Sequence, residues 1–176
     1  MDKLGYILDR RSIRRFKDQK IDDQVIKQIL TAAMYAPSAV NCQPWHVVVI
    51  DQPSLLNQIM KIHPHAGMLQ TASHGIVVCG DEELQHDDGY WVVDCGAATQ
   101  NLLLAAHTLG IGSCWVGIHP REGRKESFSS LLGLPSHVKP FALVALGYPR
   151  ETKSRPERFH AGRVRYNGWE QPFFQG

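Results

Sequence analysis

The chain has 176 residues, of which 43% are apolar and 20% are charged, and its formal net charge is +2. This length fits one domain, and the apolar content is sufficient for a core, which excludes a disordered or low-complexity chain. No apolar run approaches the roughly 18 residues that cross a bilayer, and the first residues lack a signal peptide's pattern. We therefore expect a single soluble domain, residues 1–176, in the cytoplasm and with no membrane partner.

Positive charge is concentrated at the two ends of the chain. Residues 1–20 carry seven Lys or Arg against three Asp, and residues 150–166 carry six against two Glu, so each segment has a net charge of +4. Residues 21–149 have a net charge of −5, from six basic and eleven acidic side chains. This distribution favours a small anionic ligand held by both ends over nucleic acid, which requires a basic stripe and a higher pI than 8.4.

The first half of the chain predicts two helices and two strands. Apolar side chains at helical spacing predict a helix over residues 22–35, with Asp22 as its N-cap. The β-branched run 46–50 predicts a strand that is covered on both faces, and a short helix then begins at Ser54. A second buried strand is predicted over residues 75–79.

The second half begins with the longest helical pattern, over residues 89–109, which is apolar on most faces and therefore predicts a helix buried all round. Strands are predicted at 113–118 and 141–146, with a helix around 126–132 between them. Residues 150–176 form an Arg-rich arm with no periodicity and aromatic residues near its end. Strands interleaved with helices indicate one layered α/β or α+β domain, and the apolar helix and the arm favour a homodimer.

Cysteines and histidines point to neither a disulfide framework nor a metal site. The four cysteines are too widely spaced for such a framework in a chain of this length, which predicts reduced, buried thiols: Cys42, Cys79, Cys95 and Cys114. Three histidines lie in one region without an acidic or cysteine partner at ligand spacing: His63, His65 and His74. We interpret them as surface or loop residues and expect no metal.

The first candidate binding segment contains four arginines and a hydroxyl: Arg10, Arg11, Ser12, Arg14 and Arg15. Guanidinium groups are forked, charged donors that match a phosphate, whereas the apolar side chains of this segment are expected to face a core. A solvated basic turn is the alternative interpretation.

Two further segments are candidates for binding a flat ring. The loop between the first helix and the first strand has a backbone fixed by prolines and carries amide side chains that both donate and accept: Pro37, Ser38, Asn41, Gln43 and Pro44. In the strand that contains Trp115, small residues permit close approach of a ring to the backbone. An ordinary turn and a tightly packed strand are the alternative interpretations.

With these motifs in this order, the sequence resembles the flavin-dependent nitroreductase family over nearly its whole length. The resemblance rests on these segments: Arg10–Arg14, Ala36–Ser38 with Asn41 and Gln43–Trp45, Gly110–Trp115, Leu146–Pro149, and Arg158–Phe159 with Val164–Trp169. Where relatives commonly have a histidine in the closing motif, this chain has Arg165.

The resemblance implies an α+β fold, a three-layer sandwich in which helices flank a central mixed sheet, with the C-terminal arm exchanged across a homodimer. It implies FMN at the subunit interface and NAD(P)H as the reductant. Hydride then passes through flavin N5 to nitroaromatic, quinone or related acceptors that use the same slot in a ping-pong mechanism.

The resemblance also assigns residues, all of them to cofactor binding and none to acid or base catalysis. Arg10, Ser12 and Arg14 would hold the FMN phosphate with Arg11 nearby, joined by a basic residue of the arm: Arg155 or Arg158, with Lys153 as a further candidate. The loop would approach the flavin from the other subunit: Pro37, Ser38 and Asn41, with Gln43 near. The strand would line the ring: Trp115, Val116 and Gly117.

Other functions fit parts of the sequence. A specialised relative that fragments the flavin or removes halogen shares the expected fold, but such relatives usually have added lid segments, for which this length leaves little room. A flavin-binding carrier or regulator without turnover, or a basic interaction module, would fit the charge distribution. A yellow purified protein would exclude the last of these, and bleaching by NADH or NADPH would exclude the carrier.

Overall fold

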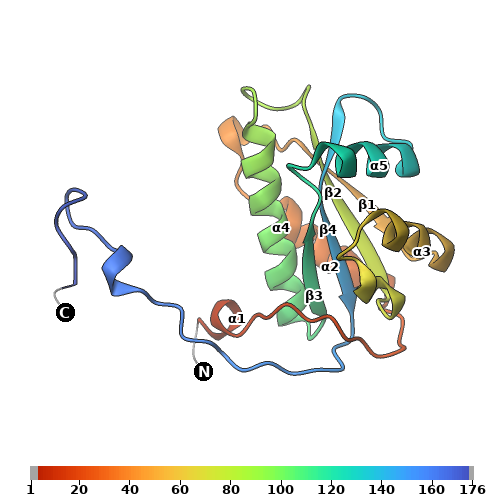
Figure 1. The fold of residues 1–176 in the computed structure, drawn as a ribbon, viewed down its shortest axis with the longest axis horizontal. Coiled ribbons are helices and arrows are strands. Elements are labelled where there is room, and N and C mark those ends of the chain that lie inside the picture. The colour runs from red at the N-terminus through yellow and green to blue at the C-terminus, as the bar shows by residue number, and fades with distance from the viewer. Residues whose placement is uncertain (1–3, 175–176) are drawn as a thin grey trace.

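An antiparallel sheet lies between two layers of helices in the computed structural model, which describes residues 4–174 (Figure 1). The strands are β1 (Trp45–Ile50), β2 (His74–Asp81), β3 (Gly112–Gly117) and β4 (Val138–Gly147), in the order β1-β2-β4-β3. β2 and β4 are central and almost wholly buried. β3 lies at one edge of the sheet, which leaves its outer side open to other parts of the molecule.

The three strand pairings are all antiparallel, so the expected mixed sheet is wrong for the described strands. Within residues 4–174, parallel pairing is limited to one isolated bridge, between Ser12 and Ser113. The N-terminal segment passes alongside β3 there, but it is too irregular to form a strand. The wider expectation of an α+β, three-layer fold is confirmed.

Helices cover both faces of the sheet because its residues alternate between two cores. On one face, α2 (Asp23–Met34) and α4 (Tyr90–Thr108) pack on a core that includes Ile76 and Val78. On the other face, α3 (Pro53–Ile62) and α5 (Glu122–Leu132) pack on a core that includes Val77 and Cys79. Figure 1 shows α4 on one side of the strands, with α3 and α5 on the other.

Local signals account for the ends of several helices. The carboxylate of Asp22 accepts a hydrogen bond from the backbone N–H of Gln24 at 2.7 Å, which confirms the predicted N-cap of α2. α3 begins at Pro53 rather than at Ser54, because proline is preorganised for the first turn of a helix. α5 ends at Gly133, whose φ of 63° is left-handed.

A few elements lie outside the predicted set because they are very short. They are α1 (Gly5–Leu8) and three 3-10 turns, at Ala39–Asn41, Gly67–Gln70 and Ala161–Arg163. None of the described helices is both long enough and apolar enough to span a membrane.

Two burial predictions are wrong for this chain by itself. β1 is not covered on both faces, because it is an edge strand, and its Val49 is 43% exposed. α4 is not buried all round, because its outer side contacts neither the sheet nor α2, and Val93 there is 68% exposed. This apolar outer side of α4 is therefore available to a further partner.

The C-terminal arm, residues 150–174, leaves the end of β4 and extends away from the rest of the molecule (Figure 1). Its first part runs beside α1 and the N-terminal segment, and its only helical element is one 3-10 turn. Large aromatic side chains remain exposed along it, including Phe159 at 61% and Trp169 at 78%. Exchange of this arm across a dimer stays a prediction.

Candidate functional site

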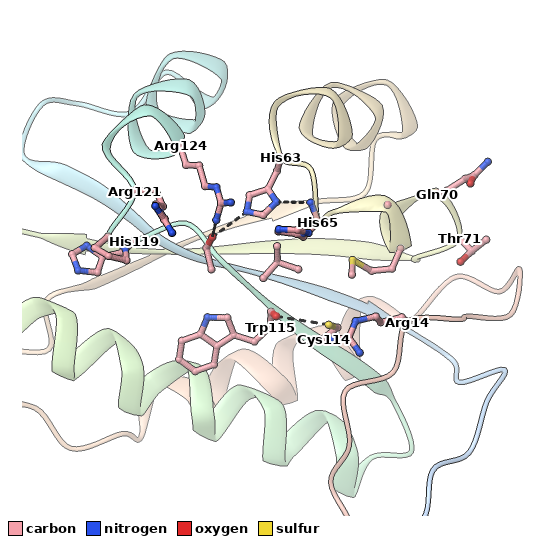
Figure 2. Close-up of a pocket in the computed structure, with 15 residues that line it drawn as sticks. Arg14, His63, His65, Gln70, Thr71, Cys114, Trp115, His119, Arg121 and Arg124 are labelled. Carbon is pink, nitrogen blue, oxygen red and sulfur yellow. Dashed lines mark hydrogen bonds between the residues drawn. The ribbon is translucent and has the colours of Figure 1, made fainter.

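A cavity of about 790 Å³ opens beside the outer edge of β3. Four parts of the chain line it: Arg14, residues 63–71 after α3, residues 114–117 of β3, and residues 119–124 at the start of α5. Figure 2 shows Arg14, Gln70 and Thr71 toward one end of this cavity, and His119 and Arg121 toward the other. Its volume lies in the range of about 300–1,000 Å³ that is typical of small-molecule and cofactor sites.

The edge strand β3 supplies one wall of the cavity. Its side chains alternate, so that Cys114 and Val116 are buried while Trp115 and Gly117 are open. The ring of Trp115 packs against Phe141, with the ring centroids 5.6 Å apart. The absence of a side chain at Gly117 leaves room for a ligand to approach the backbone. The three residues predicted to line a flavin ring, Trp115, Val116 and Gly117, therefore all lie at this cavity.

Two donors hold the end of β3 from the opposite wall. His63 Nε2 donates to the carbonyl oxygen of Gly117 at 3.0 Å, and Arg124 Nη1 donates to the same oxygen at 3.1 Å. The second ring nitrogen, Nδ1, of His63 accepts from the backbone N–H of His65 at 3.2 Å. Burial lowers the pKa of His63, so its ring is neutral at neutral pH, with one nitrogen donating and the other accepting.

The prediction that these histidines are surface or loop residues is wrong for His74, which is a buried residue of β2, whereas His63 and His65 lie in the loop after α3. His63 and His74 are 1% and 2% exposed, whereas His65 is exposed. His63 follows Ile59 by four residues and continues the buried stripe of α3, and its two hydrogen bonds satisfy the ring. That spacing was the signal in the sequence that could have identified it.

Arginines supply the permanent charge of the cavity. Arg14, Arg121 and Arg124 line it, and its lining contains no aspartate or glutamate. Burial lowers the pKa of His119 as well as that of His63, so neither ring adds a charge at neutral pH. A low-dielectric cleft lined by charges of one sign favours an anionic ligand.

Basic groups from both ends of the chain meet beside Cys114. Burial raises the pKa of the Cys114 thiol, and the positive charges of Arg14, Lys153 and Arg10 oppose that rise. Burial, followed by the guanidinium groups of Arg11 and Arg158, lowers the pKa of Arg10, because these positive charges lie close together. We call the basic groups Arg10, Arg14, Lys153 and Arg158 the cationic cradle.

Within the cradle the predicted residues differ in what they already bind. The Lys153 ammonium donates to the carbonyl oxygen of Ser12 at 2.7 Å and pairs with Glu151 at 3.5 Å. Arg158 has no side-chain hydrogen bond or ion pair within residues 4–174. Three basic arm residues are candidates for the phosphate: Lys153, Arg155 and Arg158. Of these, Arg158 is the one whose side chain has no hydrogen bond or ion pair within the described residues.

Two of the predicted phosphate residues bind the protein itself. The guanidinium of Arg11 donates to the carbonyl oxygens of Ser154, Arg10 and Leu8. Arg155 donates to both carboxylate oxygens of Asp9, at 2.7 and 2.9 Å. These bonds fasten the arm to the N-terminal segment, which is a structural contact.

The loop of residues 37–43 does not reach the cavity of its own chain, because it lies beside α4 on the other face of the sheet. The backbone N–H of Ala39 donates there to Asp94 at 3.0 Å. Val40, Asn41 and Gln43 all have left-handed φ angles, of 49°, 59° and 51°. Such angles are uncommon for residues other than glycine, and strained backbone of this kind clusters at functional sites.

Hydrogen bonds hold this unusual loop in shape. Ser38 Oγ accepts from the backbone N–H of Gln43 at 2.9 Å, and the Gln43 amide donates to Asn41 Oδ1 at 2.9 Å. Pro37 and Asn41 are exposed. Their approach to a flavin from another subunit stays a prediction.

Several residues at the cavity were missed in the sequence. They are His63, His65, Gln70, Thr71, Arg121 and Arg124. Tertiary structure brings them together from two separate segments, and no short motif joins them.

One cluster elsewhere could hold a metal ion. The ligand atoms of Asp81, Glu83 and His137 lie within 4.8 Å of one another. Asp81 already accepts hydrogen bonds from the backbone N–H of Glu83 at 2.9 Å and from His46 at 3.1 Å. These mutual contacts account for the cluster, and it does not line the cavity.

Comparison with known proteins accords with this geometry. The sequence model described as the Nitroreductase family matches residues 7–74 and 65–148. The chain belongs to this family. A relative from Methanothermobacter thermautotrophicus, named "Putative NADH dehydrogenase/NAD(P)H nitroreductase", is 42% identical over 169 residues, covering 96% of this chain and 88% of the relative.

Solved structures of nitroreductase family proteins share the fold. One from Parabacteroides distasonis has a TM-score of 0.90 and 34% sequence identity, covering 94% of this chain and 98% of that one. Another, from Desulfovibrio desulfuricans and solved in complex with FMN, has a TM-score of 0.82 and 30% identity, covering 96% of this chain and 98% of that one.

Proposed function

We propose that this nitroreductase family member is an FMN-dependent NAD(P)H oxidoreductase that acts as a homodimer. On this proposal, nitroaromatics, quinones or related molecules accept the electrons. The observation that supports it most is the cationic cradle: Arg14 lines the cavity at the open edge of β3, and Lys153 binds the carbonyl oxygen of Ser12, which bridges to Ser113 of the same strand. One end of the site is therefore suited to a phosphate, and the adjoining wall to a flat ring.

The residues present fit FMN on three counts. The lining of the cavity contains no carboxylate, and the Glu151 carboxylate beside the cradle already binds the Lys153 ammonium at 3.5 Å and the backbone N–H of Arg14 at 2.6 Å. Gly117 leaves the backbone accessible where a ring would pack. The guanidinium groups of Arg14 and Arg158 have no side-chain partners within residues 4–174, so their donors are available to a ligand.

A bound flavin supplies the hydride-accepting ring, and the protein supplies binding, orientation and electrostatics. The cationic cradle binds the phosphate, and the open edge of β3 orients the ring. The hydrogen bonds of His63 and Arg124 to Gly117 fix the end of that edge. We assign no catalytic acid, base or nucleophile, and we propose that donor and acceptor occupy the same slot in turn.

The dimer completes the site in this proposal. The loop 37–43 is held rigidly by its own hydrogen bonds, and it presents Pro37 and Asn41 to solvent. The outer side of α4 exposes Val93, and the arm exposes aromatic side chains. We propose that these surfaces bury one another between two copies, with each loop reaching the flavin of the partner.

Purification tests this function directly. We expect a yellow protein whose extracted cofactor has the mass of FMN and whose visible absorbance bleaches when NADH or NADPH is added without oxygen. A colourless protein would contradict FMN binding, and a yellow protein that does not bleach would indicate a carrier. Light scattering would measure the dimer.

Steady-state kinetics tests the shared slot. With the reductant and a quinone or nitroaromatic acceptor both varied, we expect parallel double-reciprocal lines, because one substrate must leave before the other binds. Intersecting lines would contradict ping-pong exchange.

A further inference from the structure

The cavity has a second basic end, separate from the cationic cradle. Arg121 and Arg124 line it near Gly117, whereas Arg14 lines it near Cys114 (Figure 2). A strand rises about 3.3 Å per residue, so these two ends of β3 lie about 10 Å apart. A single phosphate cannot contact both ends.

The two arginines of this second end are fixed differently. Arg124 is anchored through its bond to the Gly117 carbonyl oxygen at 3.1 Å. Arg121 makes no side-chain hydrogen bond or ion pair within residues 4–174. The neighbouring Glu122 does not neutralise either, because it pairs with Lys125 at 2.7 Å and is 74% exposed.

The start of α5 adds to the attraction for an anion. Arg121 is the N-cap residue of this helix, and its side chain makes no capping hydrogen bond. The first N–H groups of a helix and its dipole attract negative charge, and here they coincide with two guanidinium groups. Both arginines extend from α5 toward the cavity in Figure 2.

We propose that Arg121 and Arg124 bind an anionic group, a phosphate or a carboxylate, on the molecule that enters the slot beside the flavin. This inference rests on the proposed function, and it specifies the class of ligand that the slot selects. Two molecules could carry the group: a reductant with a 2′-phosphate, or an aromatic acceptor with a carboxylate. Forked guanidinium donors match the oxygens of both.

Equilibrium binding to the flavin-loaded protein tests this assignment without any turnover. Calorimetry would compare two matched pairs of ligands: NADP⁺ with NAD⁺, and 4-nitrobenzoate with 4-nitrobenzamide. We expect the wild type to bind the member with the additional anionic group, the 2′-phosphate or the carboxylate, about tenfold more tightly in at least one pair, which corresponds to about 1.4 kcal/mol.

The variants isolate the two arginines. Arg121→Gln should reduce that preference and leave the affinity for the member without the additional anionic group within about twofold, and adding Arg124→Gln should remove the preference altogether. Arg150→Gln is the matched control, since it removes one exposed arginine that does not line this cavity, and it should keep the preference. If the double variant fails to fold, Arg121→Gln carries the test, because its side chain has no partner within the described residues.

Each outcome has a definite meaning. Loss of preference in the nucleotide pair assigns the site to the 2′-phosphate, and loss in the nitroaromatic pair assigns it to the acceptor. Unchanged preferences overturn the proposal, as do variants that lose FMN, since the arginines would then belong to the flavin site. The visible absorbance of the flavin is measured first, because it separates the two proposals. A colourless wild-type protein contradicts both the proposed function and this inference. A yellow wild-type protein whose arginine variants keep the same ligand preferences contradicts only this inference.

Discussion

Residues 4–149 and the arm of residues 150–174 are ordered by different forces. The first region has two cores on a sheet whose central residues, such as Leu143 and Val144, have no exposed surface. The arm buries little, and polar contacts with the N-terminal segment fasten its beginning. Apolar burial within one chain therefore suffices for the sheet and helices, whereas the arm needs a further surface to cover its aromatic side chains.

The proposed site lies where these two regions meet. Arg10 and Arg14 belong to the N-terminal segment, and Lys153 and Arg158 belong to the arm. Changes in the arm should therefore affect cofactor and dimer, while changes in the cores should affect the stability of the fold.

Deletion of residues 154–176 should have the largest effect on cofactor binding and dimer formation, because it removes the aromatic part of the arm and Arg158 together. We expect a monomer without FMN that keeps the helical signal of the parent in circular dichroism, since both cores lie before the deletion. Light scattering and visible absorbance would measure the two losses. A truncated chain that remains a yellow dimer would show that the arm contributes to neither.

Arg14→Ala and Arg10→Ala test the contribution of the N-terminal segment to the site. Each should weaken FMN binding by about 1.5–3 kcal/mol, the range for hydrogen bonds to charged groups. Ser12→Ala should weaken FMN binding by less than this. Arg150 does not line the cavity, so Arg150→Ala should leave the affinity for FMN unchanged. Titration of the apoprotein with FMN, followed by flavin fluorescence, gives the affinities, and full affinity in either cradle variant would refute the phosphate assignment.

His63→Gln should lower the free energy of unfolding by about 1–3 kcal/mol, because the carbonyl oxygen of Gly117 and the backbone N–H of His65, both in part-buried hydrogen bonds, lose a partner of the right shape. Urea unfolding monitored by circular dichroism would measure this loss. A variant as stable as the parent would show that Arg124 alone fixes the end of β3.

The same histidine predicts a pH dependence of stability. Burial lowers the pKa of His63 in the folded state, so the unfolded chain binds more protons below its own histidine pKa of about 6.5. The contribution of His63 to the free energy of unfolding should therefore be steady above that pH, fall as the pH is lowered from about 6.5 toward the depressed folded pKa, and level off below it. Burial also lowers the pKa values of His74, His107 and His119. His63→Gln should therefore reduce the dependence of the unfolding free energy on pH without abolishing it.

Cys114→Ala should have the smallest effect, because burial raises the pKa of this thiol and keeps it protonated. We expect the rate of flavin reduction by NADH or NADPH, measured by anaerobic stopped flow, to stay within a few-fold of the parent. A loss of about a hundredfold with FMN still bound, the size expected when an acid or base is removed, would show that the thiol takes part in the reaction.

The sequence predicts the elements of the cores better than the contacts at their surface. Short apolar runs located the four strands of the described residues, and Asp22 marked the start of α2, because these signals are local. The outer side of β1 was misjudged, since its apolar run does not tell whether a helix covers both faces.

The site could be predicted only in part, because it depends on contacts between distant segments rather than on local signals. Four arginines follow one another closely in the N-terminal segment, yet Arg14 lines the cavity while Arg11 binds backbone carbonyl oxygens. Their local sequences do not distinguish them, because the direction of each side chain is set by the arm and by β3. Arg121 and His63 reach the cavity from segments far apart in the chain.

The ion pair of Arg155 with Asp9 joins residues 146 positions apart, so it also sets an order of events during synthesis. At about 5–20 residues per second, the ribosome needs about 7–30 s to pass from one to the other. Throughout that interval the N-terminal segment has emerged without the arm that fastens it. The cradle can therefore form only on a chain translated beyond Arg158, so products that terminate before that residue should not retain the cofactor.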